Sequence, residues 1–255
     1  MPFYSEFSKN YDKIFPLNSK KLSLLDNIFK DLATTRNSIH LLDIGCGTGN
    51  YALALAKLGY QLEAVDLDFE MIALAKAKAA TEDSKDLKLR FHNLNMLALD
   101  KEFKPGSFQG AYIIGNVLVH LTESEIKQFL KITADLLVKD AKLFIQIVNY
   151  DRILDLNLAG LPTIYSNDNS LYFTRNYEYQ KEKNTIFFET KLIDNLTDNL
   201  LFQNKVALYP LRQQELMANL KEAGFKVLAS YGSSKGTPYK KLSSVPLIIS
   251  ARKTT

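Results

Sequence analysis

The sequence predicts an α/β fold with a seven-stranded, mostly parallel sheet, helices on both faces and a small antiparallel β insert acting as a lid. Up to Tyr150, short and continuously apolar segments alternate with helical patterns, which is typical of a parallel sheet covered on both faces. Beyond Tyr150 the chain is rich in aromatic and β-branched residues separated by short polar turns, which indicates antiparallel strands.

Strands and helices alternate in the N-terminal half. Apolar runs predict buried strands at 39–44, 61–67, 87–93, 109–115 and 141–148. Helical spacing predicts helices at 50–59, 69–80 and 122–138. Asp68 is placed to cap the second of these helices, and Thr122 with Glu125 forms a capping-box pattern at the start of the third.

The C-terminal part supplies the insert and the closing elements. The predicted insert strands are 171–180, 185–194 and 200–210, followed by a helix at 211–225 and strands at 226–232 and 246–253. We interpret the chain as one domain over 1–255. Its parts are an N-terminal helical cap, a ligand-binding half, a β-rich insert or lid, and a closing helix with strands, at 1–38, 39–150, 151–210 and 211–255.

Composition narrows the classes of partner. Lys and Arg number 32 against 28 Asp and Glu, and this small excess is scattered along the chain, so a nucleic-acid partner is disfavoured. The single cysteine, Cys46, rules out an intramolecular disulfide and argues against cysteine-ligated zinc. The first residues lack a signal-peptide pattern, and no apolar run approaches the ~18 residues that span a bilayer. We therefore expect a cytoplasmic protein with no membrane partner and no metal.

The stretch LLDIGCGTGN, Leu41 to Asn50, joins the first predicted strand to a helix. A glycine turn there exposes backbone amides and lets a ligand approach closely. Asn50 stands where the dinucleotide fingerprint needs its third glycine, and the phosphate-binding G-x-x-x-x-G-K-S/T pattern is absent. What remains is D-x-G-x-G-x-G, and its carboxylate suits a ligand with a cationic amino-acid end.

That pattern resembles the first motif of class I S-adenosylmethionine-dependent methyltransferases, which have a Rossmann-like fold. The resemblance implies S-adenosylmethionine as the cofactor and S-adenosylhomocysteine as its product. Within the loop it assigns cofactor binding to Asp43, Gly45, Gly47 and Gly49. Asp66 ends the second strand, where a carboxylate can accept hydrogen bonds from both ribose hydroxyls.

Further cofactor contacts follow from the same resemblance. Leu67 and Met71 match positions that commonly line the adenine face in this family. Asn95 matches a position that usually carries an aspartate contacting the adenine amino group, and the Met96 backbone amide would face the ring.

Two segments, after the fourth and fifth predicted strands, indicate which group of methyltransferases the sequence resembles most. GNVLVHL and NYDRIL, together with a Tyr-Pro pair before the last helix, resemble glycine N-methyltransferase and its glycine/sarcosine relatives. The resemblance places Asn116 near the transferable methyl group. His120 is a candidate to orient the acceptor or remove its proton.

The segment after the fifth strand also assigns residues to the methyl acceptor. Asn149 and Tyr150 are the candidates that match the family. Val148 stands where glycine N-methyltransferases carry the arginine that holds the substrate carboxylate, and an apolar side chain cannot do so, which argues against glycine as the acceptor. Arg175 in the insert is a candidate to bind the acceptor from another direction.

Both chain ends offer further candidates. Aromatic N-terminal helices fold over the cofactor in many small-molecule methyltransferases of this class, so Tyr4, Tyr11 and Asp12 are candidates, with Tyr11 at the catalytic site. In the glycine-rich loop 231–239, Tyr231 or Tyr239 would rim the acceptor pocket.

We therefore expect a methyltransferase that acts on a small-molecule acceptor by in-line transfer, with an amine nitrogen favoured over oxygen. The cofactor supplies an activated methyl group, so the protein must align the reactants and exclude water. Two alternatives stay open: an RNA methyltransferase, and a non-catalytic module that binds S-adenosylmethionine. A homo-oligomer also stays open.

Overall fold

The computed structural model describes residues 5–80 and 86–254, so Tyr4 lies outside the described residues. The helices are α1 Ser5–Ile14, α2 Ser19–Phe29, α3 Asn50–Lys57, α4 Phe69–Ala79, α5 Leu99–Glu102, α6 Glu123–Leu136, α7 Tyr150–Asp155 and α8 Gln213–Glu222. The strands are β1 His40–Ile44, β2 Gln61–Asp66, β3 Leu89–Asn93, β4 Phe108–Ile113, β5 Leu137–Val148, β6 Gly160–Tyr165, β7 Leu171–Gln180, β8 Thr185–Asp194, β9 Leu200–Leu208, β10 Phe225–Tyr231 and β11 Pro246–Lys253.

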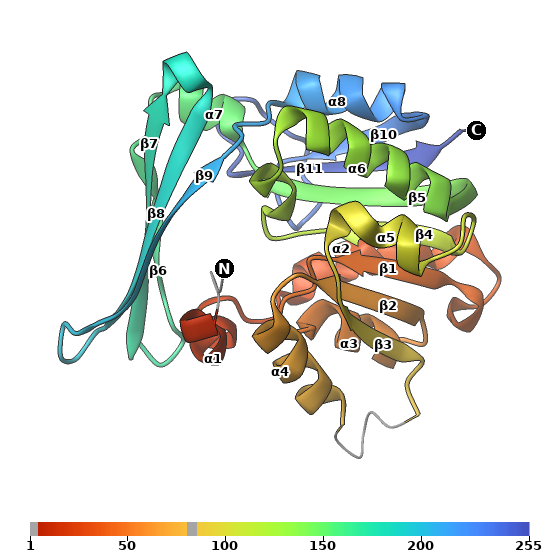
Figure 1. Cartoon of the computed structure of the whole chain (residues 1–255), viewed down its shortest axis with the longest axis horizontal. Helices are drawn as coiled ribbons and strands as arrows, with labels where there is room; N and C mark the ends of the chain where they lie inside the picture. The colour runs from red at the N-terminus through yellow and green to blue at the C-terminus, as the bar shows by residue number, and fades with distance from the viewer. Residues whose placement is uncertain (1–4, 81–85, 255) are drawn as a thin grey trace.

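These strands form two sheets, which confirms the predicted fold class (Figure 1). The seven-stranded sheet has the order β10-β11-β5-β4-β1-β2-β3, and the four-stranded sheet has the order β6-β7-β8-β9. In the larger sheet, β1 to β5 pair in parallel, whereas β11 is antiparallel to both of its neighbours. The carboxyl ends of the parallel strands therefore meet at one edge, where open α/β sheets bind ligands.

Alternate residues of the central strands pack in two separate hydrophobic cores. Leu42 of β1 packs in a core with α6 and α8, whereas its neighbour Leu41 packs in a core with α2, α3 and α4. Successive strand side chains point to opposite faces, so both faces need a covering layer. Helices accordingly cover both faces of the larger sheet (Figure 1).

The predicted elements occur with shifted ends. The capping box of Thr122 and Glu125 is present, and α6 ends at Leu136, so β5 begins earlier than its apolar run suggested. Strand β6 was not predicted, because Pro162 interrupts the pattern; proline is tolerated there because β6 is an edge strand. Within the predicted cap over 1–38, α1 lies over the ligand edge, whereas α2 packs against the core of the large sheet and reaches the cavity only at its first turn, through Lys21.

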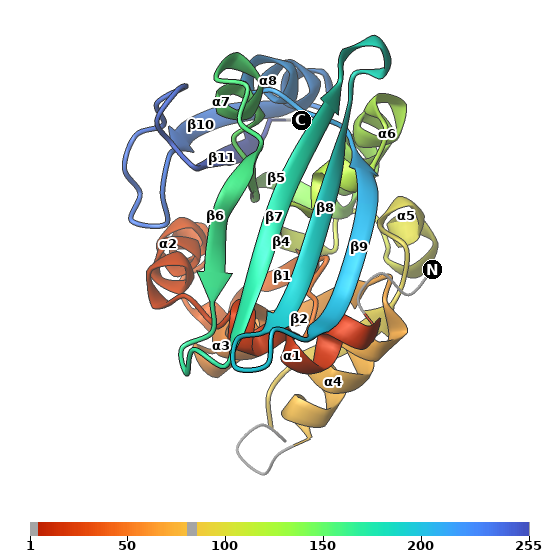
Figure 2. The same ribbon diagram turned by 90° about the vertical axis from the view of Figure 1, so that its left-hand side faces the viewer.

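The four-stranded sheet stands across the ligand edge of the large sheet (Figure 2). Its strands pair antiparallel throughout, with β7 and β8 in continuous register. Helix α1 crosses one end of this sheet, and a small core joins them: Phe7 stacks against Phe173 and Phe202 with ring centroids 5.0 and 5.4 Å apart. The insert and α1 therefore enclose the edge from two sides.

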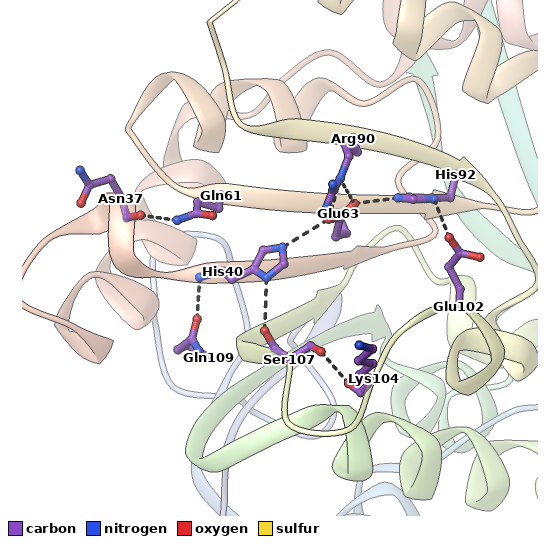
Figure 3. Close-up of polar contacts among 10 residues, drawn as sticks. All are labelled: Asn37, His40, Gln61, Glu63, Arg90, His92, Glu102, Lys104, Ser107 and Gln109. Atoms are coloured by element: carbon purple, nitrogen blue, oxygen red, sulfur yellow. Dashed lines mark hydrogen bonds and ion pairs between the residues drawn. The ribbon is translucent and has the colours of Figure 1, made fainter.

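Two of the three histidines serve the fold (Figure 3). The Glu63 carboxylate, 2% exposed in the middle of β2, accepts hydrogen bonds from Arg90 and from His92 Nε2 at 2.7 Å, while His40 Nε2 lies 3.5 Å away. Burial raises the pKa of Glu63, but these hydrogen bonds outweigh it and bring the pKa down to about 2. The cluster ties β1, β2 and β3 together through side chains.

Candidate active site

The glycine loop follows β1, and the conformation of all three glycines requires glycine. Gly45, Gly47 and Gly49 have φ angles of 75°, 54° and 77°, in the left-handed region. A β-carbon on Gly45 would lie 2.7 Å from Val117, and one on Gly49 would lie 2.7 Å from Phe91. The loop is therefore fixed both by its backbone and by the side chains packed on it.

Asp66 connects this loop to the end of β2. Its Oδ2 accepts a hydrogen bond from the Gly47 amide at 2.8 Å, and its Oδ1 accepts one from the Asp68 amide at 2.9 Å. Burial raises the pKa of Asp66. Leu67 beside it is 69% exposed, so an apolar surface lies next to the carboxylate. Asp68 caps α4, as predicted.

Asp43 is a buried carboxylate with one unpaired oxygen. It is 1% exposed; its Oδ2 accepts a hydrogen bond from Tyr112 Oη at 2.8 Å, while Oδ1 has no partner among the described residues. Burial raises the pKa of Asp43 to about 8. A buried acceptor without a donor is costly, so the site favours a ligand that brings a cationic or hydrogen-bond-donating group.

Helix α1 is fastened to the glycine loop. Asp12 Oδ1 accepts hydrogen bonds from Thr48 Oγ1 at 2.6 Å and from Asn50 Nδ2 at 2.9 Å, and Asp12 also pairs with Lys78 of α4. Tyr11 then covers the loop, because a β-carbon on Gly47 would lie 3.7 Å from its ring. Asp12 therefore holds the loop and α1 together, while Tyr11 faces the ligand side.

A cavity of about 460 Å³ lies between the glycine loop, α1 and the four-stranded sheet. Among the predicted residues, it is lined by Gly45, Tyr11, Asn116, His120 and Arg175. These residues come from the loop after β1, from α1, from the segment after β4 and from the insert, so the fold brings together groups that are far apart in sequence.

Asn116 is held rigidly at the cavity wall. Its backbone has φ 70°, its Oδ1 accepts a hydrogen bond from the Val148 amide at 2.9 Å, and its Nδ2 donates to Tyr150 Oη at 3.0 Å. The 3₁₀ turn Val117–His120 follows and brings His120 to the same cavity. Desolvation lowers the pKa of His120, which favours the neutral imidazole.

The insert contributes a cavity wall that the sequence patterns did not identify. Its inward-facing side chains are largely aromatic or apolar, and they include Leu161, Phe173, Tyr177, Phe188, Thr190 and Phe202. Further polar residues of the lining include Lys21 and Gln146, together with Asn18, Thr48, Asn50 and Tyr51. Alternation along β7 and β8 predicts two faces, but only the three-dimensional structure shows which face is turned toward the ligand edge.

Three predicted acceptor contacts do not line the cavity. Asn149 is 1% exposed, and its side chain bonds to the Arg152 amide, to Tyr239 and to backbone carbonyls of the C-terminal loop, so it has a structural role. Tyr150 is equally buried and supports Asn116. Tyr231 packs against the core that contains α2.

The predicted adenine contacts differ in accessibility. Met71 is 2% exposed and is enclosed by the protein, so it packs beneath the site instead of facing a ligand. Asn95 is exposed, but its Oδ1 already accepts from the Leu97 amide and caps the turn Met96–Ala98. Leu67 is the accessible apolar member of this group, and Met96 is partly buried.

The doubly wound sheet, the glycine loop after β1 and the carboxylate at the end of β2 are features of Rossmann-like folds, which bind nucleotides at this edge of the sheet. Residues 41–140 match the family model described as a methyltransferase domain. The glycine/sarcosine N-methyltransferase of Aphanothece halophytica is 23% identical over 232 residues, which cover 91% of this chain and 82% of that protein.

Other alignments are shorter, and the chain spans about half the length of the curated relatives concerned. The glycine N-methyltransferase of Oryctolagus cuniculus is 29% identical over 140 residues, 50% of this chain and 48% of that enzyme. Among solved structures, the CcbJ methyltransferase of Streptomyces caelestis has a TM-score of 0.81 at 17% identity and covers 100% of this chain and 99% of its own. CalS10 of Micromonospora echinaspora, an amino pentose methyltransferase bound to S-adenosylmethionine, has a TM-score of 0.70 at 16% identity, covering 97% and 96%.

Residues 41–140 therefore carry a methyltransferase domain, and the fold of the chain is that of solved S-adenosylmethionine-dependent methyltransferases. The residues present fit the cofactor of this family: Asp43 has a buried, unpaired oxygen for a cationic group, and Gly45 of the glycine loop lines the cavity with backbone alone. In the described parts of the chain, no helix is both long enough and apolar enough to cross a membrane.

Proposed function

We propose that this protein methylates a small-molecule acceptor at an amine nitrogen, using S-adenosylmethionine. One observation carries the proposal: a single cavity joins the glycine loop to Asn116, His120 and the aromatic wall of the insert. Cofactor and acceptor would therefore meet in one enclosure. A non-catalytic binding module would not need this second compartment, and a cavity of about 460 Å³ suits a metabolite better than a polynucleotide.

The cofactor would be held by residues from both sides of the loop. Asp43 would face its cationic amino-acid end, the positive-φ turn of Gly45, Gly47 and Gly49 would present the loop backbone to it, and Asp66 would accept the ribose hydroxyls. Leu67 would lie against the adenine. When bound, the sulfonium supplies an activated methyl group, so neither a metal nor a covalent nucleophile is required of the protein.

The chain's own residues would position the acceptor and manage its proton. Asn116 is fixed by two hydrogen bonds and so would present a rigid wall beside the reacting groups. His120, with its lowered pKa, would take the proton that the amine loses. Burial is the main cause that raises the pKa of Tyr11, and the nearby Asp66 charge is the second. The Tyr11 hydroxyl therefore stays protonated and would act as a hydrogen-bond donor.

The electrostatics of the cavity suit an amine that reacts in its neutral form. Among the described lining residues there is no Asp or Glu, whereas Lys21 and Arg175 are basic. These charges disfavour an ammonium ion and leave the nitrogen lone pair free to attack. The names of the related glycine/sarcosine N-methyltransferase and of an amino pentose methyltransferase with a similar fold are consistent with a nitrogen acceptor.

Calorimetry with S-adenosylmethionine tests the cofactor assignment, and absence of binding to the folded protein would refute it. A panel of metabolite amines and hydroxyl compounds, each followed by release of S-adenosylhomocysteine, then tests the acceptor. Turnover of amines, with activity lost in His120→Ala and cofactor affinity unchanged, is the expected result. Turnover confined to hydroxyl acceptors would overturn the nitrogen assignment.

A further inference from the structure

The inner face of the insert holds a group of buried polar atoms without partners. Arg175 of β7 and Thr190 of β8 are direct cross-strand partners, so their side chains lie next to each other on the cavity face. Tyr177 lies two residues along β7 on the same face. Arg175 Nε, Thr190 Oγ1 and Tyr177 Oη are all buried and have no hydrogen-bond partner among the described residues.

The Arg175 guanidinium is held in place yet incompletely satisfied. Its Nη2 donates to the Pro162 carbonyl at 2.6 Å, which anchors one end of the group and leaves the Nε edge without an acceptor. Burial lowers the pKa of Arg175, as expected for a cation removed from water. Thr190 is only 1% exposed, so solvent reaches it poorly. An unpaired buried donor on a charged group carries a large cost that an anionic acceptor would remove.

Nothing in the described lining supplies that anion. The cavity walls contain no carboxylate, and their second long cation, Lys21, adds to the positive charge. Phe173 and Phe188 line the cavity on the same face of the insert, and the Tyr177 ring stacks on Phe188 with ring centroids 5.1 Å apart. The surroundings therefore suit a planar or apolar body that carries one anionic group.

We propose that Arg175 and Thr190 form an anion-binding subsite that selects acceptors with a carboxylate on an apolar body. This inference rests on the proposed function, because it concerns the acceptor half of the same cavity. Arg175 Nε would donate to one carboxylate oxygen and the Thr190 hydroxyl to the other. Val148 also lines the cavity, but its apolar side chain cannot bind a carboxylate, so these contacts would come from the insert.

Paired probes test the subsite on the full chain saturated with S-adenosylhomocysteine. Benzoate and 3-phenylpropanoate are each compared with the neutral amide of the same shape, and affinities are measured by ligand-observed NMR at up to millimolar concentration. We expect the carboxylates to bind at least about tenfold more tightly than their amides, as a charge-assisted pair contributes ~1.5–3 kcal/mol. Equal affinity within each pair, including absence of binding by both members, overturns the proposal.

Variants separate charge at the subsite from charge on the sheet. Arg175→Gln should abolish the preference for carboxylates, and Arg175→Lys should retain part of it. Lys191→Gln removes one positive charge from the residue after Thr190, whose side chain lies on the other face of β8. This variant should keep the preference for carboxylates. A preference that survives in Arg175→Gln, or is lost equally in Lys191→Gln, contradicts the assignment.

S-adenosylhomocysteine binding is measured first, in the same samples, together with thermal unfolding. If the wild-type protein does not bind it, the proposed function itself fails. If it binds and the probes show no preference, only the anion subsite fails. Unchanged S-adenosylhomocysteine affinity in folded Arg175→Gln shows that the substitution acts on the acceptor side alone.

Discussion

Replacing Asp43 by asparagine should stabilise the cofactor-free protein. The folded-state pKa of Asp43 is about 8 against an ordinary value of 3.8, so the fold favours the protonated carboxyl. The stability that this group contributes is complete below pH 3.8 and is lost as the pH rises through about 8. At ~1.4 kcal/mol per pKa unit, the wild-type protein has lost roughly 2 kcal/mol at pH 5 and roughly 4 kcal/mol at pH 7.

The asparagine introduced by Asp43→Asn does not titrate, and its amide oxygen can still accept the Tyr112 hydrogen bond. Urea unfolding of the two cofactor-free proteins at pH 5 and pH 7 should therefore show an advantage for Asp43→Asn that grows by roughly 3 kcal/mol over this range. Asp100→Asn, an exposed position on α5, is the control and should show no such growth. An advantage that does not change with pH would refute the reasoning.

The same substitution should impair ligand binding while it improves stability. The carboxylate is the proposed partner of the cationic end of the cofactor, and a neutral amide offers that cation far less. Calorimetry should show S-adenosylhomocysteine bound at least about tenfold more weakly, which corresponds to ~1.4 kcal/mol. Equal affinity in the two proteins would mean that Asp43 faces no ligand charge.

Four further substitutions test other parts of the structure. Asp66→Ala should weaken S-adenosylmethionine binding at least about tenfold by calorimetry, since two ribose hydrogen bonds are at stake; an unchanged affinity would contradict its assignment. Gly49→Ala should lower stability by roughly 2 kcal/mol or more in urea unfolding, because the new β-carbon meets Phe91 in addition to the backbone strain. The control Gly115→Ala, with φ 80° and no atom within 4 Å of the new β-carbon, should show the backbone strain alone. Equal losses in the two variants would exclude a contribution from the clash with Phe91. Glu63→Gln should lower the free energy of unfolding by about 3 kcal/mol at neutral pH in urea unfolding. This difference should disappear as the pH falls from about 4.5 to 2, because the wild-type carboxylate then loses its charge. A pH-independent cost would count against the ion cluster. Lys78→Met should accelerate hydrogen exchange of the α1 amides, since it removes the ion pair that fastens this helix; unchanged exchange would show that aromatic packing alone holds α1.

The glycine loop could be predicted because its chemistry is local. A strand, a turn that needs positive φ and a following helix leave their pattern within one short stretch, from Leu41 to Asn50. The same holds for the Asp68 cap and for the capping box of Thr122 and Glu125, whose partners lie within one helical turn.

Side-chain direction after a strand could not be predicted. Asn149 and Tyr150 occupy positions that match the family's motif, but α7 begins at Tyr150 and turns both side chains into the interior. In the insert, alternation in β7 gives two candidate faces for Arg175, and the long-range packing of Phe173 against Phe7 decides between them. Such packing joins residues from distant parts of the chain, which no local pattern records.

Helix α1 contacts the glycine loop through polar side chains and the insert through apolar ones. Asp12 binds the glycine loop by hydrogen bonds, and Phe7 stacks on the insert through its ring. A displacement of α1 breaks both sets of contacts at once, so the cofactor end and the acceptor end of the cavity open together. Under the proposed function, exchange of S-adenosylhomocysteine and release of methylated product would be coupled by this one helix, and the rate of turnover would depend on how fast it detaches.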